Sequence, residues 1–229
     1  MSDPLPRALE ILWHEPNAPR RSGGLSRERI VAAAIALADA DGLGALSMAR
    51  LAERLGCGTM SLYRHVANKD ELVTFMLSTA TRQPPAPDPS DWRAALDDWA
   101  NGLWQVYHRH PWILQATATG PPADPGQVAW LDAGLAALAH TGLAERDKFA
   151  AVMVVLHFVR GAAAVHVEAA HVGSPDYPAL LRRVVDKDRF PALSAALADG
   201  VFDDADNDRE ADFRSGLAQL LDGIATRVK

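Results

Sequence analysis

The amino-acid sequence predicts an all-α protein of two domains. Apolar residues recur three, four or seven positions apart through most of the 229 residues, which is the period of helices that bury one face. No segment combines period-two alternation with enrichment in β-branched side chains, the pattern that is typical of strands. Proline-rich stretches at 82–90 and 120–126 interrupt the helical pattern. We expect the domain boundary at the first of them.

The part before this boundary predicts a compact group of short helices. Ser26 is suited to cap the first, Gly56 and Gly58 bracket a tight turn, and Asn68 followed by Glu71 has the spacing of a capping box. Helices are expected at about 26–42, 47–55, 59–65 and 68–81. Residues 1–25, with a possible short helix near 6–13, read as a flexible basic arm.

The second and third of these helices form a helix-turn-helix pattern. Leu62 and Val66 are expected to face the core, which leaves the polar side chains of the short third helix available to the major groove of DNA. The residues placed to contact bases or phosphates are Thr59, Met60, Ser61, Tyr63, Arg64, His65 and Lys69. Similar units occur in all-α proteins that never bind DNA, so spacing alone leaves both interpretations open.

The part after the boundary also predicts helices throughout. They are expected at about 90–108, 112–117, 145–172 and 213–228, with others ending near 140 and starting near 191. The stretch 172–181 is expected to be irregular. This part holds 13 Lys and Arg against 20 Asp and Glu, so an acidic body follows a mildly basic front end.

Two runs in the front end, ALADADGLGALSMARLAERLG and LYRHVANKDEL, resemble the DNA-binding domain of the TetR (tetracycline-repressor) family over residues 26–81. The remainder resembles, more loosely, the C-terminal domain of the tetracycline repressors at HRHPWILQ, LHFVRGAA, RFPAL and FRSGLAQLLDGI. The resemblance implies an all-α homodimer that binds a pseudo-palindromic operator and leaves it when a small effector binds. It places the family's DNA contacts on the same residues as above. Ala49 stands where the tetracycline repressors have a base-reading Arg, so the operator is expected to differ.

The resemblance also implies an effector-binding and dimerisation domain at 82–229. The residues expected to line the effector cavity are Trp99, Leu103, Trp104, Trp112, Gln115, Trp130, His157 and Phe158. Helix-spaced aromatic residues are more often core, and that alternative stays open. The tryptophan content favours an apolar effector, aromatic or polycyclic. Gln115 occupies the position of a His that binds the magnesium–drug complex in the tetracycline repressors, so neither a metal site nor a cofactor is expected.

The family pairs its last long helices across a two-fold axis. The residues expected at this dimer interface are Gly161, Ala164, Phe213, Leu217, Leu220, Leu221 and Ile224. The alternative is that these apolar stripes are buried within one subunit.

Several classes of protein are disfavoured by what the sequence lacks. It contains no nucleotide-binding glycine loop and no nucleophile elbow, so we do not expect an enzyme. The single Cys57, the absence of a signal peptide and the lack of an apolar run of about 20 residues indicate a cytoplasmic protein. The competing hypothesis is a DNA-binding or interaction protein that responds to no ligand.

Overall fold

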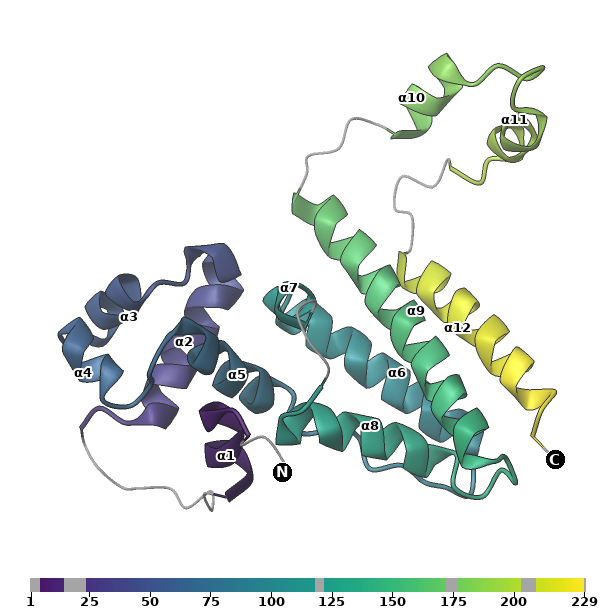
Figure 1. Cartoon of the computed structure of the whole chain (residues 1–229). Helices are drawn as coiled ribbons and strands as arrows, with labels where there is room; N and C mark the ends of the chain where they lie inside the picture. The colour runs from purple at the N-terminus through teal and green to yellow at the C-terminus, as the bar shows by residue number, and fades with distance from the viewer. Residues whose placement is uncertain (1–4, 15–23, 118–121, 172–176, 203–208, 229) are drawn as a thin grey trace.

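The computed structural model describes residues 5–14, 24–117, 122–171, 177–202 and 209–228. Within these ranges the chain forms twelve α-helices and one short 3-10 helix, and no strand. The prediction of an all-α fold is confirmed. Figure 1 shows a smaller lobe built from the first five α-helices beside a larger bundle that contains α6–α9 and α12. A cluster of buried apolar side chains extends through both.

The smaller lobe contains α2 (Arg27–Asp41), the 3-10 helix η1 (Leu43–Ala45), α3 (Met48–Leu55), α4 (Thr59–Tyr63) and α5 (Lys69–Ala80). The expected caps are in place. Ser26 Oγ accepts a hydrogen bond from the Arg29 amide, and Asn68 Oδ1 accepts one from the Glu71 amide. These caps satisfy backbone donors that the first helical turn leaves without intrahelical partners, so each helix begins where the sequence predicted.

The N-terminal segment differs from the expected flexible arm. Residues Arg7–His14 form α1, which packs on α5. Ala8 is buried, and Ile11 and Leu12 contact the core. The possible helix near 6–13 is therefore real and docked, because one face of it is apolar. The basic part of the arm, 15–23, lies outside the described residues.

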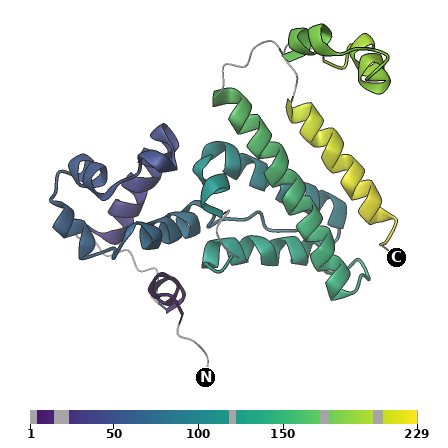
Figure 2. The same ribbon diagram turned by 45° about the horizontal axis from the view of Figure 1, so that its top comes forward.

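The larger bundle contains α6 (Trp92–Arg109), α7 (Trp112–Ala116), α8 (Pro125–Ala137), α9 (Glu145–His171) and α12 (Arg209–Ala225). The long helices α9 and α12 run side by side in opposite directions (Figures 1 and 2), and α9 also packs on α6 and α8. The helix α8 reaches across to α5 of the smaller lobe. This contact is one of the connections between the two lobes.

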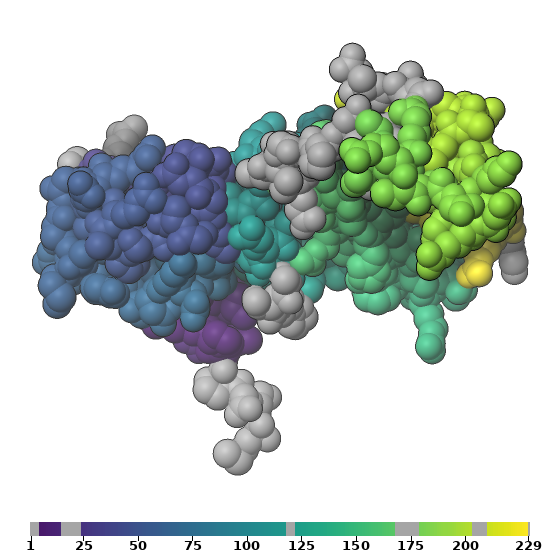
Figure 3. Space-filling view, turned by 90° about the horizontal axis from the view of Figure 1, so that it is seen from above, coloured from purple at the N-terminus to yellow at the C-terminus, as the bar shows by residue number. Residues whose placement is uncertain are grey.

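Two further helices stand apart from the bundle. They are α10 (Tyr177–Val184) and α11 (Pro191–Ala198), at one end of the face shown in Figure 3. The prediction of irregular structure over 172–181 was wrong for its last five residues. Pro178 does not prevent the helix, because it lies in the first turn, where an amide donor has no intrahelical acceptor.

Candidate nucleic-acid interface and its connection to the second lobe

The turn between α3 and α4 aims a short helix outward from the smaller lobe. Gly56 ends α3 with φ of 64°, a left-handed conformation that glycine adopts without strain. Leu62 and Val66 are completely buried. They fix α4 against the lobe by its inner side, as the sequence predicted. In Figure 1, α4 lies at the end of the lobe farthest from the bundle.

The remaining side chains of this region form an outward face. Met60 is 77% exposed, Tyr63 is 46% exposed, and Thr59, Arg64 and Lys69 are also exposed. Ser61 and His65 are half-buried at its edge. Arg64 donates to Ser61 Oγ at 3.1 Å, and the Lys69 ammonium lies 3.4 Å from the Leu43 carbonyl oxygen. The residues predicted to contact DNA are therefore exposed or half-buried on α4, in the loop that follows it and at the first residue of α5.

Sequence similarity to known proteins decides the family. Residues 30–74 match the profile described as "Bacterial regulatory proteins, tetR family", and residues 84–228 match "Tetracyclin repressor-like, C-terminal domain". The chain belongs to the TetR family. It is therefore a helix-turn-helix transcriptional regulator, in a family of non-enzymatic proteins.

Individual relatives agree with this assignment. The HTH-type transcriptional repressor DrrR1 of Streptomyces coeruleorubidus is 34% identical, over 99% of this chain and 88% of the relative. The class A tetracycline repressor of transposon 1721 from Escherichia coli is 32% identical, over 89% and 92% of the two chains. The structure of Streptomyces coelicolor ActR with actinorhodin superposes with a TM-score of 0.76 at 25% identity, covering 89% of this chain and 98% of ActR.

Two tryptophans connect the bundle of this TetR-family regulator to the end of α5. The Trp99 indole N–H donates to the Trp130 carbonyl oxygen at 2.7 Å, and the Trp130 indole N–H donates to the Thr81 carbonyl oxygen, also at 2.7 Å. All three residues are buried. Because buried hydrogen bonds are costly to leave unmade, this relay couples α6, α8 and the C-terminal end of α5.

The other residues predicted to bind the effector are in three different places. Leu103 and Trp104 are buried, and Trp104 stacks on Phe213, which in turn stacks on Phe158. Trp112 donates its indole N–H to Asp39 of α2, so it connects the lobes. His157 is exposed on α9. The tryptophans named in the sequence analysis are thus buried and connect helices, and their place in the lining of an effector cavity stays a prediction.

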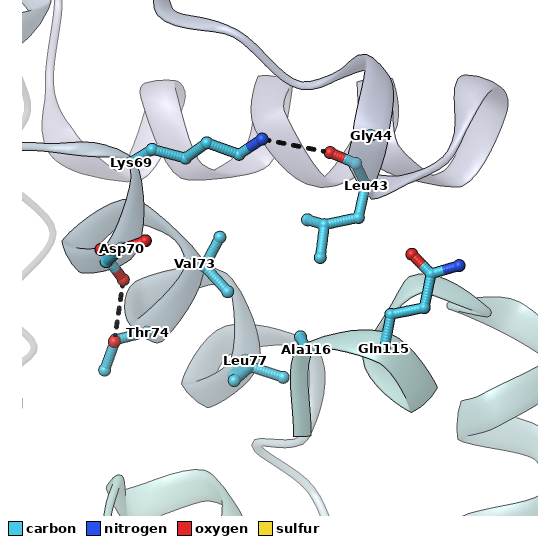
Figure 4. A pocket seen from close by; sticks show the side chains of 9 residues that line it. All are labelled: Leu43, Gly44, Lys69, Asp70, Val73, Thr74, Leu77, Gln115 and Ala116. Carbon is cyan, nitrogen blue, oxygen red and sulfur yellow. Dashed lines mark hydrogen bonds between the residues drawn. The ribbon is translucent and has the colours of Figure 1, made fainter. Parts of the chain in front are cut away.

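Gln115 lies in a groove between the lobes. The groove has a volume of about 480 Å³ and is formed by η1, α5 and α7. Leu43, Val73 and Leu77 provide apolar walls, while Lys69 and Gln115 lie at opposite ends (Figure 4). Periodicity could not reveal this groove, because its walls come from three separate segments of the chain.

A histidine pair lies between α6 and α9. His108 Nδ1 is 2.7 Å from the Trp104 carbonyl oxygen, so this nitrogen carries the proton and donates. His108 Nε2 lies 2.8 Å from His166 Nδ1. No set of three or more metal-binding side chains occurs in the part of the chain that the structure describes.

The N-terminal cap of α8 is a buried carboxylate. Asp124 Oδ1 accepts hydrogen bonds from the amides of Gly126 and Gln127, and burial raises the pKa of Asp124 above its ordinary value of 3.8. A raised carboxyl pKa gives stability that is complete below the ordinary pKa and lost as the pH rises through the raised one.

We therefore expect Asp124→Asn, which still caps a helix, to become progressively more stable relative to the wild type as the pH rises. Thermal unfolding of both proteins between about pH 4 and pH 7 checks this, since the difference in Tm should change in that direction. Asp88→Asn is the control. The carboxyl of Asp88 is exposed, and hydrogen bonds with Ser90 lower its pKa, so the shift there is opposite in direction to that of Asp124. A constant difference for Asp124→Asn would contradict the prediction.

The stripe predicted to form the dimer interface is largely internal. Phe213, Leu217, Leu221 and Ile224 are buried within the single chain, where α12 packs on α9. Leu220 and Ala164 are half-buried, and Gly161 is exposed. The interpretation of the four buried residues as an intersubunit surface is corrected, because the subunit's own core covers them.

The helix α9 nevertheless has an apolar outer side. Among the described helices it alone is long and apolar enough to cross a membrane by length and composition, over Glu145–Val167. The sequence predicts no uninterrupted apolar run of about 20 residues, and Arg160 does interrupt this stretch. Only 22% of its most apolar window is buried inside the subunit. Val154 and Val165 are 48% and 67% exposed, and His157 and Gly161 lie between them on the same side.

Proposed function

We propose that the protein is a homodimeric repressor that binds a pseudo-palindromic operator and leaves it when a small apolar effector binds. The observation that carries this proposal is the outward face of α4, which presents Met60, Tyr63 and Arg64 while Leu62 and Val66 anchor the helix. An exposed, apolar and cationic helix face at the end of a lobe fits a major groove, and the family assignment supports the same function.

The roles of the individual side chains follow from their chemistry. Arg64 is suited to donate two hydrogen bonds to guanine, and Met60 to contact a thymine methyl group. Thr59 is placed beside them at the start of α4. Lys69, with the amides at the start of α5, is suited to hold a phosphate. Ser61, Tyr63 and His65 are assigned to the flanking backbone.

The exposed side of α9 is the proposed dimer surface. A helix of a second subunit would cover Val154, Gly161 and Val165 on α9. The exposed small residues Ala218 and Ala225 of α12 would extend this surface. A second copy of the same surface satisfies two-fold symmetry. Two copies of α4 about 34–36 Å apart would then read successive turns of the duplex.

The effector is proposed to act on α5. Actinorhodin is a ligand of ActR, and by analogy a polycyclic aromatic compound is the proposed effector class here. Binding in the bundle would favour an arrangement in which the Trp130–Thr81 hydrogen bond holds α5 differently, so that the two α4 helices no longer match the operator. The residues proposed to contact the effector are among Trp99, Leu103, Trp104, Trp112, Trp130 and Phe158. Gln115, in the groove between the lobes, is proposed as a further contact.

The operator test compares the wild type with Arg64→Ala and Lys69→Ala on a duplex that the wild type selects from a random pool. Arg64→Ala is expected to weaken binding by about 10- to 100-fold and to relax specificity at one base pair. Lys69→Ala is expected to weaken binding to all sequences alike. It should also reduce the slope of the logarithm of the binding constant against the logarithm of the salt concentration by about one. Fluorescence anisotropy at several salt concentrations measures both effects.

Arg109→Ala is the control, since Arg109 is exposed on α6 and is assigned no contact with DNA. A folded dimer that selects no duplex would overturn the proposal and favour an interaction protein. Release of a selected duplex by actinorhodin or a related polycyclic compound would support the effector class. Failure of release across such compounds, with operator binding intact, would favour the hypothesis of a ligand-independent regulator.

A further inference from the structure

The helix α1 is a docked element that neither family profile covers. The profiles match 30–74 and 84–228, whereas α1 spans Arg7–His14. Figure 1 shows it beneath α5. We propose that α1 is a strap that positions the DNA-reading lobe and connects it to the bundle, with Arg7 and Trp13 as its two attachments. This inference rests on the proposed function, because its effect is read out on operator binding.

The first attachment is an ion pair with a buried partner. Arg7 Nη1 lies 2.5 Å and 2.8 Å from the two carboxylate oxygens of Glu71, whose side chain is 6% exposed. An ionised carboxylate at such a site is costly unless a cation and hydrogen bonds compensate it. Arg7 supplies that cation from a segment 64 residues away in sequence.

Glu71 transmits this attachment to the DNA-binding surface. Its Oε1 accepts a hydrogen bond of 2.9 Å from the amide of Ala67, in the loop between α4 and α5. His65, a proposed phosphate contact, lies in that loop, and Lys69, another, directly follows it. The position of the loop therefore depends on Glu71, and the ionised Glu71 is stabilised by Arg7. Arg7 acts here as a positioning residue and is assigned no contact with DNA.

The second attachment reaches the bundle. The Trp13 indole N–H donates to the Ala123 carbonyl oxygen at 3.0 Å, next to the Asp124 cap of α8. The buried Ala8, with Ile11 and Leu12, holds α1 on the core between the two attachments. A displacement of α8 relative to α5 is therefore expected to strain or break one of the two attachments, of which the Trp13 bond is solvent-exposed.

The test compares Arg7→Gln, Arg7→Lys and Trp13→Phe in the full chain. Arg7→Gln is expected to weaken binding to the selected duplex by about 2- to 30-fold, the range for a residue that acts indirectly, without changing the salt dependence. Hydrogen exchange in residues 64–72 should become faster. Arg7→Lys should recover much of both effects. Trp13→Phe keeps the aromatic ring and removes the donor, so exchange in α1 should become faster.

The matched control is Arg93→Gln, which breaks an exposed ion pair with Asp222 in the bundle and should change neither readout. Unchanged exchange and affinity in Arg7→Gln would overturn the proposal. If the slope of the logarithm of the binding constant against the logarithm of the salt concentration falls by about one in Arg7→Gln, the proposal is also overturned, because Arg7 would then be a phosphate contact. If the wild type itself selects no duplex, the proposed function fails, while the exchange experiment still decides whether Arg7 orders the loop.

Discussion

Val154→Glu is expected to give a folded monomer that has lost nearly all operator affinity. Val154 is 48% exposed on α9, so glutamate is tolerated in the isolated subunit. In the proposed dimer the carboxylate would be buried against its symmetry mate, where an unpaired charge is strongly unfavourable. A monomer engages one half-site, and losing the second reduces apparent affinity by about 10²- to 10⁴-fold.

Sedimentation velocity and anisotropy on the selected duplex measure these two effects. Leu5→Glu is the control, because Leu5 is equally exposed but lies before α1, far along the chain from α9. It should leave the dimer unchanged. A Val154→Glu protein that sediments as a dimer would show that the exposed side of α9 is not the interface. A Val154→Glu monomer with full operator affinity would contradict the proposal that binding requires two half-sites.

The helix-turn-helix could be predicted in detail because its signals are local. Ser26 and Asn68 are caps that act within three residues, and Gly56 ends α3 by its own conformation. The outward residues of α4 follow from the burial of Leu62 and Val66. Each prediction needed only one helix and its neighbours.

The dimer stripe was misassigned because periodicity shows that a face is covered without showing what covers it. Phe213 and Leu217 have the spacing of an interface and of an internal seam alike, and the structure assigns them to the seam. The exposed side of α9 is less regular, with His157 and Gly161 between its valines. Such a face becomes visible only when the buried side of the helix is known.

The long-range contacts of α5 could not be predicted for a related reason. Arg7 pairs with Glu71, and Trp130 bonds to the Thr81 carbonyl, across 64 and 49 residues of chain. Nothing in the sequence distinguishes these side chains from an exposed arginine or a core tryptophan. Together they make α5 the element on which α1 and α8 both act, which places coupling between the lobes there.

The contact of α8 with α5 leads to the second large effect. Gly126, in the first turn of α8, lies so close to α5 that an added Cβ would be 2.4 Å from Thr81 Oγ1 and 2.6 Å from the Ser78 carbonyl oxygen. The second of these atoms is backbone, so a rotamer change cannot relieve the clash. Gly126→Ala must therefore move α8 away from α5, at a cost of about 1–3 kcal/mol.

Thermal unfolding should show a Tm lower by about 2–12 °C for Gly126→Ala. Gly223→Ala is the matched control, since that glycine is also helical and an added Cβ would meet nothing within 4 Å. Its Tm should stay the same or rise, because alanine favours helices. Adding Thr81→Ala should rescue Gly126→Ala only in part, since the Ser78 carbonyl remains. An unchanged Tm for Gly126→Ala would mean that α5 and α8 can separate freely, and the Trp130–Thr81 relay would then be unable to transmit a change from the bundle to the DNA-reading lobe.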